Sequence, residues 1–209
     1  PKIHAEGYKF LIIAGIITIV FYSFSDFFGL IGFVLTIWVY YFFRDPERVI
    51  IGDDNYLVSP ADGEIIKVEE VDGPKELGLD NKKFQKISVF MNVFDCHVNR
   101  SPCGGKIEEI LYKPGKFLNA SFDKASEDNE RNYFKIKDNQ NNDVIVVQIA
   151  GLVARRIVCE SSKDQQLNQG DRIGMIRFGS RADVFYENYQ PLVKIGQKAI
   201  SGETLLAKK

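Results

Sequence analysis

Residues 193–207 read VKIGQKAISGETLLA, and this stretch indicates the fold class. Two short apolar runs are separated by small and polar residues, which is the pattern of a strand, a turn and a second strand. Residues 59–65, SPADGEI, open a similar pattern much earlier in the chain, with an Asp-Gly turn signal ahead of apolar residues. The two stretches together predict β structure on both sides of the intervening sequence.

The chain between these stretches also consists of short apolar runs separated by turn residues. Each of its short apolar runs is bounded by Gly, Pro, Asn or Asp, and no long helical periodicity interrupts them. The runs are residues 64–71, 86–93, 133–136, 144–149, 173–178 and 182–185. Residues 118–128 are expected to form a loop or irregular insertion. The tail resembles the barrel-sandwich fold of biotinyl and lipoyl domains, so we expect residues 49–209 to form a mainly β domain.

The first 48 residues differ sharply from the rest. Between Phe10 and Phe43 only Asp26 carries a charge, and eight of the sixteen phenylalanines lie there. One helix of this length would be roughly 50 Å long, well beyond the hydrocarbon core of a bilayer at about 30 Å. Polar residues at 23, 25 and 26 and a glycine at 29 indicate a break. The sequence therefore predicts a hairpin of two apolar helices, residues 10–24 and 27–43.

We interpret this hairpin as a retained membrane element that spans the bilayer or lies in its interface. The alternatives are a cleaved signal peptide and a buried core hairpin. No small-residue cleavage site follows the first segment, and a second apolar run does follow it. Basic residues flank both ends (Lys2, Lys9, Arg44 and Arg48), so the positive-inside rule places the β domain at the cytoplasmic side of the cell membrane.

Charge and cysteine content exclude several classes of protein. Lysine and arginine total 27 against 28 acidic residues in a chain of 209, which lacks the basic surplus that nonspecific nucleic-acid binding requires. The three cysteines form no CxxC pair, so no disulfide framework is indicated. Cys96, His97 and Cys103 lack a fourth ligand at recognisable spacing, and we expect no metal site.

Two places remain as candidates for chemistry. His97 ends an apolar strand and is either structural or functional, whereas His4 lies in the N-terminal tail. The second candidate is the Gly179-Ser180 step, flanked by Arg177 and Arg181. Because glycine has no side chain, its carbonyl is open to the following hydroxyl. Attack by Ser180 would make an ester, elimination would give dehydroalanine, and hydrolysis would leave a pyruvoyl group.

Six blocks along the chain, in the right order, resemble the phosphatidylserine decarboxylase proenzymes in their short bacterial and archaeal form. The resemblance covers nearly the whole chain, including the apolar hairpin. The blocks are residues 41–48 (YFFRDPER), 59–63 (SPADG), 94–100 (FDCHVNR), 115–120 (GKFLNA), 128–132 (DNERN) and 174–181 (GMIRFGSR).

The resemblance implies a self-processing, pyruvoyl-dependent decarboxylase that converts phosphatidylserine to phosphatidylethanolamine and CO2 through a Schiff base. Cleavage between Gly179 and Ser180 would give a β chain of residues 1–179 and an α chain of residues 180–209 that stay associated. Asp62 and His97 match family positions linked to serine activation and proton transfer. Where longer members carry His-x-x-His, this chain has His97 followed by Arg100, so the base for cleavage is His97 itself or Asp62 aided by strain.

The substrate headgroup carries a phosphodiester and a carboxylate, which cationic side chains would bind. The candidates are Arg100, Arg155, Arg156, Arg177 and Arg181. An exposed β edge is compatible with a homodimer. Three other functions stay open: the same reaction on archaetidylserine, a non-enzymatic membrane-anchored adaptor, and a biotinyl or lipoyl carrier. The chain lacks the long helical hairpin typical of such an adaptor and the turn that presents the acceptor lysine of such a carrier. Neither function explains the Gly-Ser block.

Overall fold

A computed structural model describes residues 2–118, 120, 128–151, 156–177 and 180–209. Contacts within the chain divide it into two compact units, Pro1–Glu47 and Arg48–Lys209. The first unit contains two helices and a two-stranded sheet of β1 (Lys2–Ile3) and β2 (Arg44–Asp45). The second unit contains the remaining strands and a single turn of 3-10 helix, η1 (Lys75–Leu77), within its described residues.

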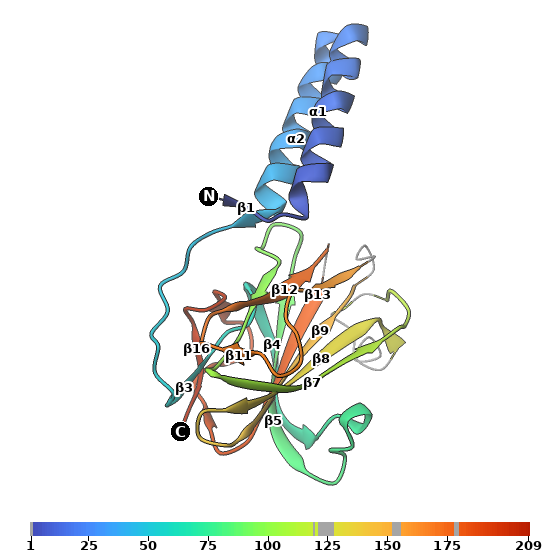
Figure 1. Cartoon of the computed structure of the whole chain (residues 1–209). Coiled ribbons are helices and arrows are strands. Elements are labelled where there is room, and N and C mark those ends of the chain that lie inside the picture. The colour runs from blue at the N-terminus through green and yellow to red at the C-terminus, as the bar shows by residue number, and fades with distance from the viewer. Residues whose placement is uncertain (1, 119, 121–127, 152–155, 178–179) are drawn as a thin grey trace. The chain divides into compact units, whose positions relative to one another are not determined.

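The two apolar helices, α1 (Gly7–Phe24) and α2 (Asp26–Phe42), are joined at Ser25 (Figure 1). The break forms there because the backbone of Ser25 is extended and its hydroxyl accepts a hydrogen bond from Phe27 N at 3.3 Å, which caps α2. Small residues let the helices approach: a side-chain carbon at Gly32 would lie 3.0 Å from Thr18 Cα. The predicted helical pair is confirmed, with its ends shifted by a few residues.

The helical pair exposes most of its large apolar side chains. Ile16 and Ile19 of α1 are 56% and 71% exposed, and Phe24 is 79% exposed. Polar contacts lie between the helices, where the hydroxyls of Thr18 and Thr36 are 2.9 Å apart. The helix α1 is long and apolar enough to cross a membrane, whereas α2 is one residue shorter. These exposed side chains form a surface that water would solvate poorly.

The second unit is built on an eight-stranded antiparallel sheet that curls on itself (Figure 1). Its strands, in spatial order, are β11 (Gln166–Leu167), β7 (Gly105–Lys113), β8 (Arg131–Asp138), β9 (Asp143–Ile149), β13 (Ser180–Tyr186), β5 (Lys83–Met91), β4 (Gly63–Asp72) and β15 (Lys198–Ala199). The strand β13 lies between β9 and β5 and is hydrogen-bonded to both. The C-terminal segment therefore supplies an internal strand of the sheet.

Two three-stranded sheets complete the unit. One has the order β10 (Ile157–Cys159), β12 (Arg172–Ile176) and β6 (Val98–Arg100); the other has the order β14 (Gln190–Pro191), β16 (Leu205–Lys208) and β3 (Tyr56–Val58). A large apolar core joins them to one face of the eight-stranded sheet, and a smaller cluster covers part of the other face. Alternate residues of β13 serve the two clusters, Val184 the large one and Phe185 the small one.

The mainly β fold is confirmed. All six apolar alternations became strands, and the predicted strand pair of the tail is present as β15 and β16. The two tail strands do not pair with each other: β15 pairs with β4, and β16 pairs with β3. The long strand β7 was not predicted, because adjacent acidic residues and a bulge in its pairing with β8 interrupt the apolar alternation. The predicted loop at residues 118–128 lies mostly outside the described residues.

The Asp-Gly turn at residues 62–63 has a structural reason. Gly63 begins β4 with φ at +152°, a conformation that residues with a side chain rarely adopt. A side chain there would also run into the carbonyl of Phe90 on the neighbouring strand β5. The motif thus lets β4 pair closely with β5, the strand that also pairs with β13.

Candidate active site

Ser180 is the first residue of β13, and its side chain is completely buried. It lies directly opposite Met91, the last residue of β5, in the antiparallel register. Its hydroxyl donates to Met91 Sδ at 3.7 Å. Strand alternation places Ser180 on the same face as Ala182 and Val184, which belong to the large core. Gly179, the other half of the predicted cleavage site, lies outside the described residues.

His97 is brought to the same end of the sheet by the turn that follows β5. That turn starts at Asn92, directly after the partner of Ser180, and Asp95 N closes it by donating to Asn92 O at 3.0 Å. The ring of His97 is completely buried, and its Nδ1 is 2.9 Å from Asp95 O. Ile176 N donates to His97 O at 3.3 Å. The segment carrying the Gly-Ser step therefore begins beside His97 and ends beside Met91.

Asp62 is held by two partners in the second unit. Its carboxylate accepts from Arg48 Nη2 at 2.7 and 2.9 Å, and its Oδ1 also accepts from Ser201 N at 2.8 Å. Both side chains of the ion pair are largely buried. A role for Asp62 in serine activation stays a prediction.

The five arginines predicted for the headgroup differ in their surroundings. Arg100 is 5% exposed and donates from Nη1 to Gly170 O at 3.0 Å. Arg156 is exposed, and its carbonyl accepts from the backbone N–H of Arg177 at 3.2 Å. Burial lowers the pKa of Arg177, whose side chain is only partly exposed. Arg155 lies outside the described residues. Arg156 and Arg177 are thus neighbours through their backbones, and Arg177 lies three residues before Ser180 in the sequence.

Arg181, the fifth arginine, is buried in an ion pair on the opposite face of β13 from Ser180. Its Nε lies 2.8 Å from Asp183 Oδ1, its Nη2 donates to Oδ2 at 2.9 Å, and its Nη1 donates to Ala120 O at 3.3 Å. Both side chains are at most 2% exposed. The ion pair fixes the start of β13, directly after the Gly-Ser step.

We expect Asp183→Ala to lower the free energy of unfolding by about 3–5 kcal/mol, because it leaves the buried Arg181 charge without its carboxylate. Thermal unfolding of the full chain in detergent, followed by circular dichroism, measures this loss. The control is Asp72→Ala, which removes the carboxylate from an exposed ion pair with Lys83 and should leave stability almost unchanged. Equal stability of the two variants would contradict the prediction.

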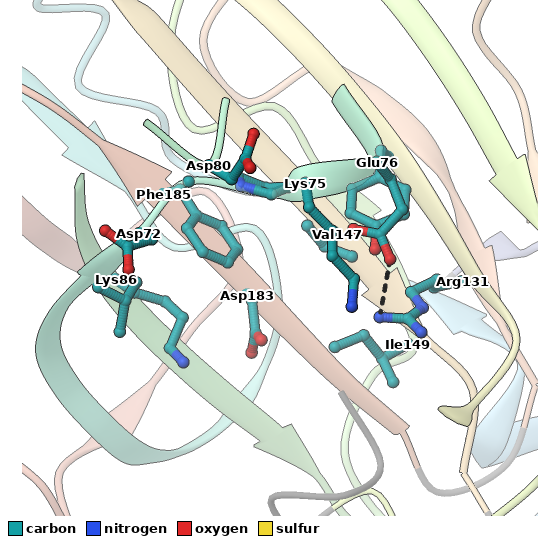
Figure 2. A pocket seen from close by; sticks show the side chains of 14 residues that line it. Asp72, Lys75, Glu76, Asp80, Lys86, Arg131, Val147, Ile149, Asp183 and Phe185 are labelled. Carbon is teal, nitrogen blue, oxygen red and sulfur yellow. Dashed lines mark ion pairs between the residues drawn. The ribbon is translucent and has the colours of Figure 1, made fainter. Parts of the chain in front are cut away.

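A pocket of about 300 Å³ opens on the face of the sheet that carries Asp183 and Phe185 of β13 (Figure 2). Its floor is apolar and includes Phe185 of β13, and charged side chains such as Lys86 and Asp183 surround it. Figure 2 marks the ion pair between Arg131 Nη1 and Glu76 Oε1, 3.7 Å apart. Because Ser180 points to the other face, the sheet itself separates this pocket from the Ser180 hydroxyl.

The cysteines form no disulfide within the described residues. Cys96 and Cys103 are buried and unbridged, and burial raises the pKa of the Cys103 thiol far above its ordinary value. Cys159 is exposed. In the described part of the chain, no three His, Cys, Asp or Glu side chains are grouped as they would be around a metal ion.

Three residues near Ser180 were not predicted as functional: Met91, Asn99 and Gln148. Gln148 and Asn99 are both completely buried and bonded to each other, with Gln148 Nε2 donating to Asn99 Oδ1 at 2.9 Å. A polar residue inside an otherwise apolar strand was the available signal for Gln148, since β9 reads DVIVVQI. Asn99 lies two residues after His97 in one of the blocks that resemble the decarboxylases.

The chain thus combines a mainly β domain, preceded in sequence by an apolar helical pair, with a buried serine that begins an internal strand and a buried histidine that follows the turn at the same end of the sheet. The family model for phosphatidylserine decarboxylase matches residues 35–207 of this chain. The chain belongs to the phosphatidylserine decarboxylase family.

Named relatives agree over the whole chain. It is 77% identical to the phosphatidylserine decarboxylase proenzyme of Pelagibacter ubique (strain HTCC1062) over 209 residues, which is all of this chain and 97% of the relative. The proenzymes of Ruegeria pomeroyi and Cereibacter sphaeroides are 53% and 51% identical over 205 residues, which is 98% of this chain and 94% and 88% of theirs.

Proposed function

We propose that this chain is a self-processing decarboxylase that removes CO2 from the serine headgroup of phosphatidylserine. The observation that carries the proposal is the position of Ser180: it begins an internal strand, fully buried, in a chain 77% identical to a phosphatidylserine decarboxylase proenzyme. If the serine lay on the surface, cleavage would leave the new N-terminus exposed to solvent. Ser180 would keep it inside the fold, because β13 is hydrogen-bonded on both sides.

Self-cleavage would use only atoms of the chain and one water molecule. The Ser180 hydroxyl adds to the Gly179 carbonyl, the peptide C–N bond breaks, and the hydroxyl proton passes to the freed amine, which gives an ester. Loss of the Cα proton of residue 180 and cleavage of its Cβ–Oγ bond release the Gly179 carboxylate and leave dehydroalanine. Water then replaces the nitrogen, ammonia leaves, and a pyruvoyl group remains at position 180.

The surroundings of Ser180 fit such a group. The pyruvoyl is uncharged and no larger than the serine it replaces, and the side chain of Ser180 packs in the core against the thioether of Met91. When present, the pyruvoyl supplies a carbonyl that bonds the substrate amine and takes up the electron pair that CO2 leaves behind. Burial keeps the site away from bulk solvent, which strengthens the electrostatic interactions there.

The other steps fall to side chains near the same end of the sheet. His97 lies close to the segment that carries the cleavage site, so we assign to it the proton that must reach the substrate carbon after CO2 leaves. Arg156 and Arg177 lie opposite each other, one position beyond the paired residues Ile157 and Ile176 of β10 and β12. We assign these two arginines to the phosphate and the carboxylate of the substrate. Arg100 and Arg181 donate to groups within the fold.

Intact mass spectrometry of the full chain, made from the unmodified gene and purified in detergent, tests the proposal. We expect two species that co-purify: residues 1–179, and residues 180–209 lighter by one ammonia than a serine-headed peptide. Incubation with phosphatidylserine, and separately with archaetidylserine, should release CO2 and identify the lipid backbone. A single species of full mass that persists after incubation with membranes would favour the adaptor function instead.

The helical pair would hold the enzyme at the membrane that contains its substrate, with the β unit on the cytoplasmic side. Most of its large apolar side chains are exposed within the described unit, which suits contact with acyl chains. A homodimer also belongs to the proposal. Its interface would need more than the edges of the large sheet, because β11 and β15 are two residues each.

We expect Ile16→Lys and Ile19→Lys, made together, to release the full chain from phosphatidylcholine vesicles, because each lysine near the middle of an apolar helix costs about 2.5–3.5 kcal/mol. Flotation on a density gradient measures the bound fraction. Val49→Lys is the matched control, since Val49 is 84% exposed but lies outside the helices. Binding that survives the double substitution would place membrane attachment elsewhere in the chain.

A further inference from the structure

A row of buried amide side chains runs from the large sheet toward Ser180. Asn132 Nδ2 of β8 donates to Gln148 Oε1 of β9 at 3.3 Å, and Gln148 Nε2 donates to Asn99 Oδ1 of β6 at 2.9 Å. All three side chains are at most 2% exposed. Gln148 lies opposite Ala182 in the register of β13, two residues from Ser180 on the same face. The row therefore links two different sheets beside the candidate cleavage site.

The row ends at the sulfur that also contacts Ser180. Asn99 Nδ2 donates to Met91 Sδ at 3.6 Å, and Ser180 Oγ donates to the same sulfur at 3.7 Å. Asn99 Nδ2 also lies 3.4 Å from Pro60 O. Two donors from different strands therefore converge on one thioether. Met91, Ser180 and Asn99 are each completely buried, so water does not compete for these contacts.

Such an arrangement costs stability. A buried amide must be fully hydrogen-bonded to offset its desolvation, and a thioether is only a weak acceptor. Apolar side chains at these positions would continue the core formed by Val146, Ala182 and Val184. Polar groups kept in a core at a cost to stability commonly mark a functional site. The position of this row, ending at the contact of Ser180, indicates what that function is.

We propose that Asn99 is a positioning residue for the self-cleavage of this chain. Held by Gln148, its amide fixes the thioether of Met91, and the sulfur in turn directs the Ser180 hydroxyl. A weak acceptor suits this task because it orients the hydroxyl without holding the proton that must leave when the oxygen attacks. The inference rests on the proposed self-processing of Ser180 and assigns residues that act on it.

The test follows cleavage of newly made full-length chain in a cell-free translation with phospholipid vesicles, by electrophoresis over time. We expect Asn99→Leu and Met91→Leu each to slow cleavage by about 10- to 100-fold, since misplacing a reacting atom has effects of this size. Because both variants break the same chain of contacts, the double variant should be no slower than the slower single one. Because contacting residues also couple through stability, a slow rate counts as a positioning effect only where thermal unfolding shows the variant to be folded.

Two further variants control for folding. Met175→Leu removes the other methionine, which is also completely buried, and should cleave at the wild-type rate. Gln148→Met leaves Asn99 in place but removes the donor to its Oδ1, so cleavage should slow even if Asn99→Leu fails to fold. Thermal unfolding of each purified chain shows that the slow variants are folded.

The outcomes separate this inference from the proposed function. A wild-type chain that stays uncut overturns the self-processing itself. A wild-type chain that cuts, together with folded Asn99 and Gln148 variants that cut equally fast, overturns only the role of Asn99. Effects of Asn99→Leu and Met91→Leu that multiply in the double variant would show that Asn99 does not act through Met91, and they overturn the proposal as well.

Discussion

The Ser180→Ala variant is expected to remain a single uncut chain with no decarboxylase activity. Alanine has no oxygen to attack the preceding carbonyl, so neither the ester nor anything derived from it can form. The substitution removes one oxygen atom from a side chain whose contact in the described structure is the sulfur of Met91. The fold should therefore tolerate the change, and the effect on both processing and activity should be complete.

Mass spectrometry and CO2 release from carboxyl-labelled phosphatidylserine measure the two losses separately. The matched control is Ser88→Ala. Ser88 is also completely buried and lies on β5, but it pairs with Asp183 rather than with Ser180, so its side chain faces the other side of the sheet. This control should cleave and decarboxylate normally. Decarboxylation by an uncut Ser180→Ala chain would remove residue 180 from the mechanism.

The His97→Ala variant is expected to lose decarboxylation by about 10²- to 10⁴-fold, the range typical of a missing general acid or base. The contact of Nδ1 with the carbonyl of Asp95 fixes the ring orientation, and a proton on Nδ1 leaves Nε2 as the atom that exchanges protons. A strand-end packing histidine would instead show its loss in stability alone. The variant therefore distinguishes a chemical role from a structural one.

Cleavage of the same variant is followed independently by electrophoresis. If His97 serves both steps, because Arg100 stands where longer family members have a second histidine, cleavage will slow as well. Normal cleavage with lost decarboxylation would assign the cleavage base to another group. His4→Ala is the control for loss of a histidine, since it is the other histidine in the sequence and lies in the helical unit. Normal rates for both steps in His97→Ala would contradict the assignment.

The fold class could be predicted because the patterns are local. Apolar alternation bounded by turn residues specified the six strands, and a long uncharged stretch interrupted at residues 23–29 specified two helices. Strand β7 escaped prediction because it reads GKIEEILYK, in which adjacent acidic residues accompany a bulge in its pairing with β8 between Ile107 and Glu109. A bulge shifts the side-chain alternation by one residue, so the period of two is lost.

The candidate site could be predicted only in part. Ser180 and His97 carry reactive groups and stand in recognisable blocks, so sequence was enough to select them. The partners of Asp62 were not foreseen, because Arg48 and Ser201 lie 14 and 139 positions away along the chain. Asn99 and Gln148 have no reactive group, and they gained significance only from the bond between them.

The sequence by itself determined which atoms are available for chemistry and which segments prefer strand or apolar helix, because these depend on residue type and on short spacings. The tertiary structure alone decided that Met91 lies opposite Ser180, that Asn99 reaches the same sulfur from another sheet, and that Arg181 turns away from the site into a buried ion pair. Strand order and register decide such contacts. They result from burying all the apolar faces at once, which no short stretch of sequence specifies.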